Sequence, residues 1–148
     1  MNELQTIRFS WIKITTDEFA VIEHFDTSRM DIAINIGFAA LPPEHVLAIQ
    51  TKCTFNQQGK PRLVIAVSGY FDIDPVDWQT MYDKEKKTLY LALQPARALA
   101  SLTLSTLRGV LHAKTEGLSV NAIPLPPIDL AEIVKEPVFI TLPDEVPA

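Results

Sequence analysis

The chain has 148 residues, 47% of them hydrophobic and 21% charged, which fits one globular domain and excludes an intrinsically disordered protein. Its net charge of −5 at pH 7 disfavours a nucleic-acid partner, because binding to phosphates needs clustered Lys and Arg. No apolar stretch is long enough to cross a bilayer, and the first residues lack the pattern of a signal peptide. We therefore expect a cytoplasmic protein without membrane insertion.

The first half of the chain, from about residue 6 to residue 74, alternates apolar and polar residues as strands do. The first run, residues 7–14, changes phase within one step next to Trp11, which predicts a β-bulge there. The short run at residues 19–22 either extends this strand or forms an edge.

Three further runs of this half, residues 31–38, 46–55 and 63–73, each place apolar residues on one face. Cys53 is the single cysteine of the chain and falls on the apolar face of the second of these runs, which indicates a small core residue. The half-polar pattern predicts an antiparallel sheet of four strands, for which up-and-down order is the simplest topology.

The second half, from about residue 79 to residue 134, has the hydrophobic period of helices. Pro95 can open a helix and Gly117 can close it, so we expect a long helix over residues 95–116. Inside this helix, Gly109 costs about 1 kcal/mol relative to alanine. Either close packing requires it there, or it is a tolerated defect.

The apolar arc of the long helix is broader than packing on one side of a four-stranded sheet requires. We therefore expect part of it to be buried between the subunits of a homo-oligomer, a dimer or a tetramer. The candidate interface residues are Leu99, Leu102 and Val110.

No catalytic or metal-binding constellation is evident. The three histidines lie in different elements and lack metal-ligand spacing. The acidic residues Asp72, Asp74 and Asp77 lack the glycine and the distal glutamate of a calcium loop, so we interpret them as a polar strand exit. The five glycines form neither a phosphate cradle nor a nucleophile elbow. We expect no enzymatic activity, no catalytic residue, no bound metal and no cofactor.

The most specific pattern follows the long helix. After Gly117 comes an extended apolar stretch, and residues 125–130, Leu-Pro-Pro-Ile-Asp-Leu, lead into a second helix that Asp129 can cap. This order resembles the SecB family of export chaperones, whose first long helix ends at a glycine and whose second begins at a similar motif. Residues 69–73, Gly-Tyr-Phe-Asp-Ile, are similar to the end of that family's fourth strand, and Arg108 falls near its helical arginine.

The resemblance implies an α+β fold with a four-stranded antiparallel sheet, one long helix and a short second helix. It implies one domain over residues 1–148, with an extended tail from residue 135. It also implies ATP-independent binding of unfolded polypeptide, with a role in protein export. The candidate peptide-binding residues are Tyr70, Phe71, Trp78, Ile123, Leu125 and Ile128.

Two features depart from the family. Pro137 limits the second helix to about two turns, whereas the family's second helix is long. Residues 143–148 contain no Cys or His, whereas the family's tail binds zinc and docks on the motor SecA, so the sequence does not support SecA binding. Two alternatives stay open: a dedicated-partner or structural module of toxin–antitoxin or mobile-element type on the same fold, and a small-ligand-binding α+β domain with an enclosed pocket.

Overall fold

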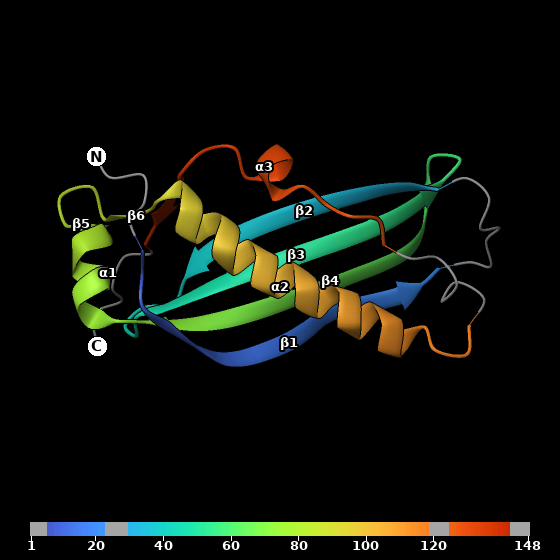
Figure 1. Ribbon diagram of the computed structural model, residues 1–148, viewed down its shortest axis with the longest axis horizontal. Coiled ribbons are helices and arrows are strands. Elements are labelled where there is room, and N and C mark those ends of the chain that lie inside the picture. Colours follow the sequence, from blue (N-terminus) through green and yellow to red (C-terminus); the bar gives the residue numbers. More distant parts are fainter. Residues whose placement is uncertain (1–5, 23–29, 119–124, 143–148) are drawn as a thin grey trace.

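The computed structural model describes residues 6–22, 30–118 and 125–142. Four of the described strands form the main antiparallel sheet, and these are β1 (Phe9–Val21), β2 (Asp31–Ala40), β3 (Val46–Gln57) and β4 (Lys60–Ile73). The helix α2 (Leu93–Lys114) crosses one face of this sheet diagonally (Figure 1). The shorter elements are α1 (Pro75–Met81), β5 (Tyr82–Asp83), β6 (Thr88–Leu91), α3 (Leu130–Ile133) and β7 (Val138–Thr141). The predicted α+β class, with one long helix and a short later one, is confirmed.

The strand order in the main sheet is β1-β4-β3-β2, so the predicted up-and-down order is wrong for the first strand. Strands β2, β3 and β4 follow one another as expected, but β1 pairs with β4. Residues 22–30 connect β1 to β2, and this connection is longer than the roughly two to five residues of a hairpin loop. A connection of this length does not require the two strands to be neighbours. Residues 63–67 of β4 are apolar on both faces and buried, as suits a strand with a neighbour on either side.

Strand β1 is an edge strand that bends at two irregularities. The first register shift lies between Trp11 and Lys13, which confirms the bulge predicted near Trp11. A second lies between Thr16 and Glu18. Residues 19–21 continue the pairing with β4, so the short run that follows the bulges extends the first strand.

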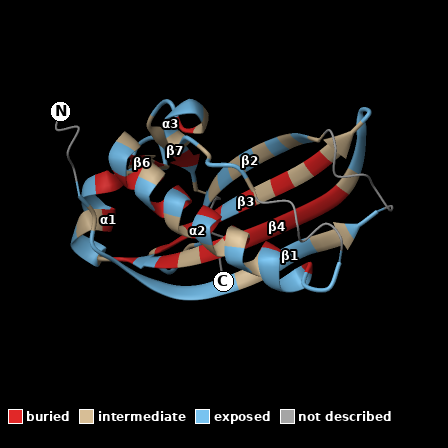
Figure 2. Ribbon diagram, turned by 45° about the vertical axis from the view of Figure 1, so that its right-hand side comes forward, coloured by how far each residue is buried: buried red, intermediate tan, exposed pale blue. Residues whose placement is uncertain are grey.

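The core lies between the main sheet and the elements on its helix-covered face. Figure 2 shows β4 buried over most of its length, whereas β1 is exposed over most of its own. One cluster of buried side chains gathers near the start of α2, and a second lies under its C-terminal half. Cys53, as predicted, belongs to the second cluster and is completely buried.

Gly69 allows α2 to approach the sheet closely. A Cβ atom at this position of β4 would lie 2.9 Å from Oγ1 of Thr103 on α2 and 3.0 Å from Cε2 of Phe71. Thr103 of α2 thus fills the space that a side chain at position 69 would take on the apolar face of β4. Thr103 is buried there, and its hydroxyl donates to the carbonyl oxygen of Leu99 at 2.9 Å.

Helix α2 matches the predicted helix with shifted ends. It begins at Leu93, two residues before Pro95, which occupies the first turn where a missing N–H costs no helical hydrogen bond. The cap residue is Thr115, and Gly117 adopts a positive φ of 85° in the turn beyond it. Of the two interpretations of Gly109, close packing finds no partner among the described residues of this chain, since nothing lies within 4 Å of an added Cβ. Within the described chain, Gly109 fits a tolerated defect.

The region expected to be helical from residue 79 contains strands as well. Helix α1 is capped by Asp74, whose carboxylate accepts hydrogen bonds from the backbone of Val76 and Asp77. Strands β5 and β6 then form a hairpin, with Asp83 accepting from two backbone N–H groups of its turn. Leu89 and Leu91 of β6 are completely buried. Strands of two and four residues show too few periods for the pattern to identify them.

Two features of the C-terminal part match the sequence prediction, the cap of the second helix and the extended segment after Pro137. Asp129 caps α3, its carboxylate accepting from the backbone N–H of Ala131 at 2.9 Å. The helix has a single turn, even shorter than expected. The extended segment after Pro137 forms β7, which pairs with β6 and completes a second, three-stranded sheet.

Candidate functional site

An open apolar groove of about 420 Å³ lies between β2 and the segment of residues 133–138. Its lining residues are Ile36 and Phe38 from β2, and Ile133, Val134, Lys135, Glu136 and Val138 from the C-terminal part. Five of these side chains are apolar, and the two charged ones are adjacent in sequence. A groove of this composition suits an apolar, extended ligand more than a compact polar one.

The floor of the groove belongs to a row of side chains on β2. Ile32, Ile34, Ile36 and Phe38 share the helix-covered face, as their alternation predicted, and all four are only half-buried. Among the described strands of the main sheet, β2 pairs only with β3. The row therefore runs along a sheet edge, and side chains on one face of a strand repeat about every 7 Å, which matches an extended polypeptide.

Two arginines of α2 anchor the C-terminal part of the chain, Arg97 at the other wall of the groove and Arg108 at the Leu-Pro-Pro motif. Arg108 donates from Nη1 to the carbonyl oxygen of Leu125 at 2.7 Å and from Nη2 to that of Pro126 at 2.8 Å. Arg97 donates from Nε to the carbonyl oxygen of Val134 at 2.9 Å. The Leu-Pro-Pro motif and the start of the groove wall are thus tied to one helix by charge-assisted hydrogen bonds.

A second apolar surface lies on β1. The helix α2 packs on β3 and β4, and side chains of the first half of β1 are left partly open. Phe9 and Trp11 are each 38% exposed, and Ile12 at the bulge is 53% exposed. Both rings contact Phe71, Phe9 edge-on at 5.6 Å between ring centroids and Trp11 stacked at 5.4 Å. Clustered exposed apolar side chains mark interaction surfaces.

The opposite face of the main sheet carries a network of polar side chains around Asp17, beside the apolar Val64 and Ala66. Ser68, Gln50 and Thr15 all donate hydrogen bonds to the carboxylate of Asp17. Burial alone would raise the pKa of Asp17, but these three donors outweigh it and hold the pKa below its usual value of 3.8. Lys52 pairs with Glu18 at 3.2 Å. The polar groups of this network already have partners, so this part of the face does not suit an apolar chain.

The structure does not bring the predicted peptide-binding residues together. Phe71 and Trp78 are core residues, 0% and 6% exposed, with His45 stacked on Trp78. Tyr70 follows Gly69 and precedes Phe71 in β4, so its side chain lies on the opposite, polar face, where Lys13 lies 5.4 Å from its ring centroid.

Leu125 and Ile128 are half-buried within the motif of residues 125–130, and Leu125 packs on the second core cluster. Ile123 lies outside the described residues. Sequence reasoning missed the groove itself, since Ile36 and Phe38 read as ordinary core residues and residues 133–138 gave no sign of lying beside them. The half-polar alternation of β2 was the available signal.

The predicted interface residues differ in what they can offer a partner. Leu99 is completely buried within the chain, so it has no free side-chain surface. Leu102 and Val110 are half-buried on the flanks of α2, packed against the first and the second core cluster respectively. Burial between subunits stays a prediction for these two.

Reactive groups are few in the described part of the chain. Burial raises the pKa of the Cys53 thiol to about 12. No cluster of three His, Cys, Asp or Glu side chains suited to a metal ion occurs among the described residues. None of the described helices has the length and apolar character needed to cross a membrane.

Comparison with known proteins identifies the fold. The structure is similar to that of the SecB-like chaperone Rv1957 of Mycobacterium tuberculosis, solved in complex with a ChAD peptide from the HigA1 antitoxin. The TM-score is 0.55 at 14% sequence identity, over 82% of this chain and 88% of that chain. No protein-family model and no curated protein sequence matches this chain. The chain therefore has a SecB-like fold, as the residues after the long helix predicted.

Proposed function

We propose that the protein binds non-native polypeptide in the cytoplasm without ATP, as a SecB-like chaperone. The open apolar groove between β2 and residues 133–138 carries the proposal. Its half-buried row on an edge strand matches the side-chain spacing of an extended chain. The similar fold of a chaperone solved with a bound peptide supports it. Protein export is one process that such binding serves, since export needs chains kept unfolded.

Each apolar contact in such a groove contributes only a modest free energy of binding. Apolar burial contributes roughly 25 cal/mol per Å², and ordering a flexible client offsets much of this gain. Because side chains on an extended strand select for apolar character more than for sequence, many unrelated clients should bind.

Assembly belongs to the same proposal. The half-buried side chains of Leu102 and Val110 lie on the flanks of α2, where a second subunit can cover them. We expect a homo-oligomer, a dimer or a tetramer, and sedimentation of the wild-type chain at micromolar concentration is the test. A strictly monomeric species would contradict this part of the proposal.

Aggregation of an unrelated, slowly refolding protein tests the binding activity. The wild type is expected to suppress light scattering at a several-fold molar excess in the absence of nucleotide. Unchanged scattering for every client would refute the proposal.

A dedicated-partner module is the second candidate. The structurally similar chaperone was solved with a peptide of one antitoxin, which favours a single natural client. Protection of one partner protein and of no unrelated client would replace the general chaperone with this candidate.

A further inference from the structure

The start of β1 covers an apolar site that belongs to the core. Ile7 packs against the first core cluster, and the rings of Phe9 and Trp11 lie on Phe71 at 5.6 Å and 5.4 Å between centroids. Phe71 is 0% exposed beneath them, whereas Phe9 and Trp11 are each 38% exposed. Two half-open rings thus keep a third ring out of water.

This short segment is separated from the rest of its strand. Phe9, Ser10 and Trp11 pair in register with residues 71–73 of β4, and the register then shifts before Lys13. Ile12, at the shift, is 53% exposed. Because a bulge interrupts the ladder, residues 7–11 can leave β4 while the later part of β1 stays paired.

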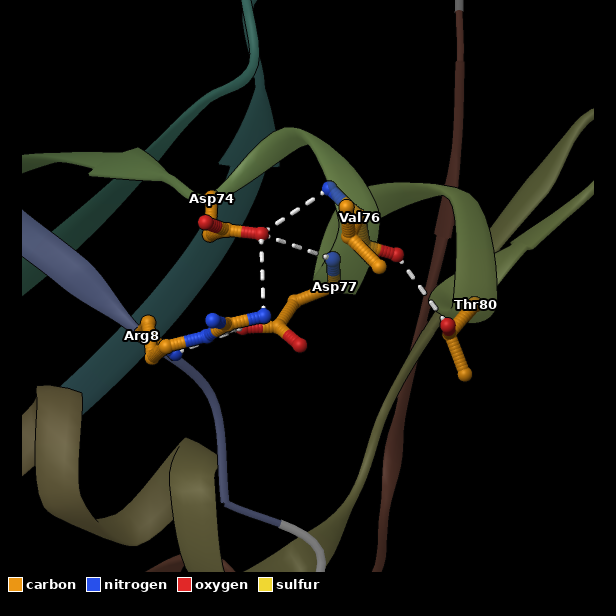
Figure 3. A network of polar contacts seen from close by, with 5 residues as sticks. All are labelled: Arg8, Asp74, Val76, Asp77 and Thr80. Atoms are coloured by element: carbon orange, nitrogen blue, oxygen red, sulfur yellow. Dashed lines mark hydrogen bonds and ion pairs between the residues drawn. The ribbon is translucent and has the colours of Figure 1, made fainter.

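Polar contacts with α1 hold the outer end of the segment (Figure 3). Arg8 donates from Nε to Asp77 at 3.2 Å and from Nη2 to Asp74 at 3.3 Å, and its backbone N–H donates to Asp77 at 2.8 Å. The Arg8 side chain is 69% exposed. The carboxylates of Asp74 and Asp77 are 29% and 20% exposed, so the two ion pairs of the Arg8 side chain stay in contact with water and are weakened by salt. We call these two side-chain contacts the latch.

We propose that residues 7–11 occupy a binding site for client polypeptide and are displaced when a client binds. This inference rests on the proposed chaperone function and names a site distinct from the groove at β2. Residues 7–11 themselves indicate the kind of client that fits the site. It is an extended segment in which a basic residue is followed by aromatic residues one and three positions later, as in Arg8, Phe9 and Trp11. Asp74 and Asp77 receive the basic group, Phe71 receives the rings, and residues 71–73 provide a free strand edge.

A reversible covalent lock tests the displacement. Ser10 and Asp72 lie opposite each other in the ladder and are both exposed, at a Cα separation typical of cross-strand pairs, roughly 4.5 to 5.5 Å, which a disulfide spans. In the variant Ser10→Cys/Asp72→Cys the segment is fixed when oxidised and free when reduced. The control is Ala20→Cys/Val64→Cys, which links the same two strands beyond both bulges.

The probe is a fluorescein-labelled peptide, Ser-Ser-Arg-Phe-Ser-Trp-Ser-Ser, read by fluorescence anisotropy. We expect the oxidised Ser10→Cys/Asp72→Cys protein to bind it at least tenfold more weakly than the reduced protein, with no such difference in the control pair. Arg8→Ala, which removes the two latch contacts with Asp74 and Asp77 but keeps the backbone N–H, should bind a few-fold more tightly than wild type. Hydrogen exchange of residues 9–11 should accelerate when the peptide is added, while that of residues 18–21 stays slow.

Equal binding by the oxidised and reduced proteins would overturn the displacement and leave the chaperone proposal standing. The same holds if wild type suppresses aggregation but binds no peptide of this pattern. Failure of wild type in both assays would instead refute the proposed function and this inference with it.

Discussion

Replacing Gly69 with alanine tests how the long helix is seated on the sheet. The new Cβ would lie 2.9 Å from Oγ1 of Thr103 and 3.0 Å from Cε2 of Phe71, whereas ordinary contacts of this kind are 3.4–4 Å. Relieving about half an ångström of overlap in a packed core costs on the order of 1–3 kcal/mol. The lower entropy of the unfolded alanine chain offsets about 0.4–1 kcal/mol of this. We therefore expect Gly69→Ala to lower the free energy of unfolding by about 1.3 kcal/mol, the difference between the midpoints of the two ranges.

Urea denaturation followed by circular dichroism measures the effect, and a second substitution identifies its origin. Thr103→Ala removes the hydroxyl that the new Cβ would meet, so Gly69→Ala should cost less in that background than in wild type. A Gly69→Ala protein as stable as wild type would refute the close approach of α2. An equal cost in both backgrounds would show that Thr103 is not the obstacle.

Three further predictions concern stability and reactivity. Gly109→Ala, with no atom within 4 Å of its new Cβ, should raise the free energy of unfolding by about 0.5–1 kcal/mol, and a lowered urea midpoint would contradict this. The Cys53 thiol, whose pKa burial raises to about 12, should react with a thiol reagent at pH 8 only when urea unfolds the chain; rapid labelling of the native protein would contradict its burial. The lowered pKa of Asp17 gives stability that is present above the usual value of 3.8 and is lost as the pH falls through the still lower folded value. Asp17→Asn should therefore flatten the loss of stability as the pH falls below the usual pKa of 3.8, and an unchanged pH profile would refute this role.

The face of the sheet on which each side chain lies was predictable from the alternation of apolar and polar residues. The alternation in residues 31–38 and 46–55 placed the side chains of β2 and β3 correctly, because a strand permits only two orientations. The phase change beside Trp11 has one simple structural cause, a bulge, and the pairing of β1 with β4 shows it there. Asp129 was identified as a cap because a short acceptor before an apolar run satisfies the first helical N–H groups.

Strand order and the candidate site were harder to predict from the sequence, because both depend on contacts between segments that are distant in the chain. The pairing of β1 with β4 is set by the sheet as a whole, and only the two-sided apolar run at residues 63–67 pointed to it. Tyr70 and Phe71 were assigned to one groove although consecutive strand residues face opposite ways, an error that alternation alone could have prevented. The groove wall is anchored by a hydrogen bond from Arg97 to the backbone carbonyl of Val134, which no residue pattern encodes.

Equilibrium binding of a permanently unfolded polypeptide to the groove tests the central claim most directly. Val138 lines the groove, whereas its neighbour Phe139 is 68% exposed, contacts the Tyr90 ring at a tilt and is not part of the lining. The two residues therefore form a matched pair on β7. Because Val138 is already half-buried, its truncation forfeits about half of the 1.5–3 kcal/mol of a fully buried aliphatic side chain, a roughly threefold to tenfold loss of affinity. We predict that Val138→Ser binds the labelled polypeptide weaker by this factor, while Phe139→Ser binds like wild type at matched stability. Equal affinities for all three proteins, or no binding by wild type, would contradict the assignment of this groove as the client-binding site.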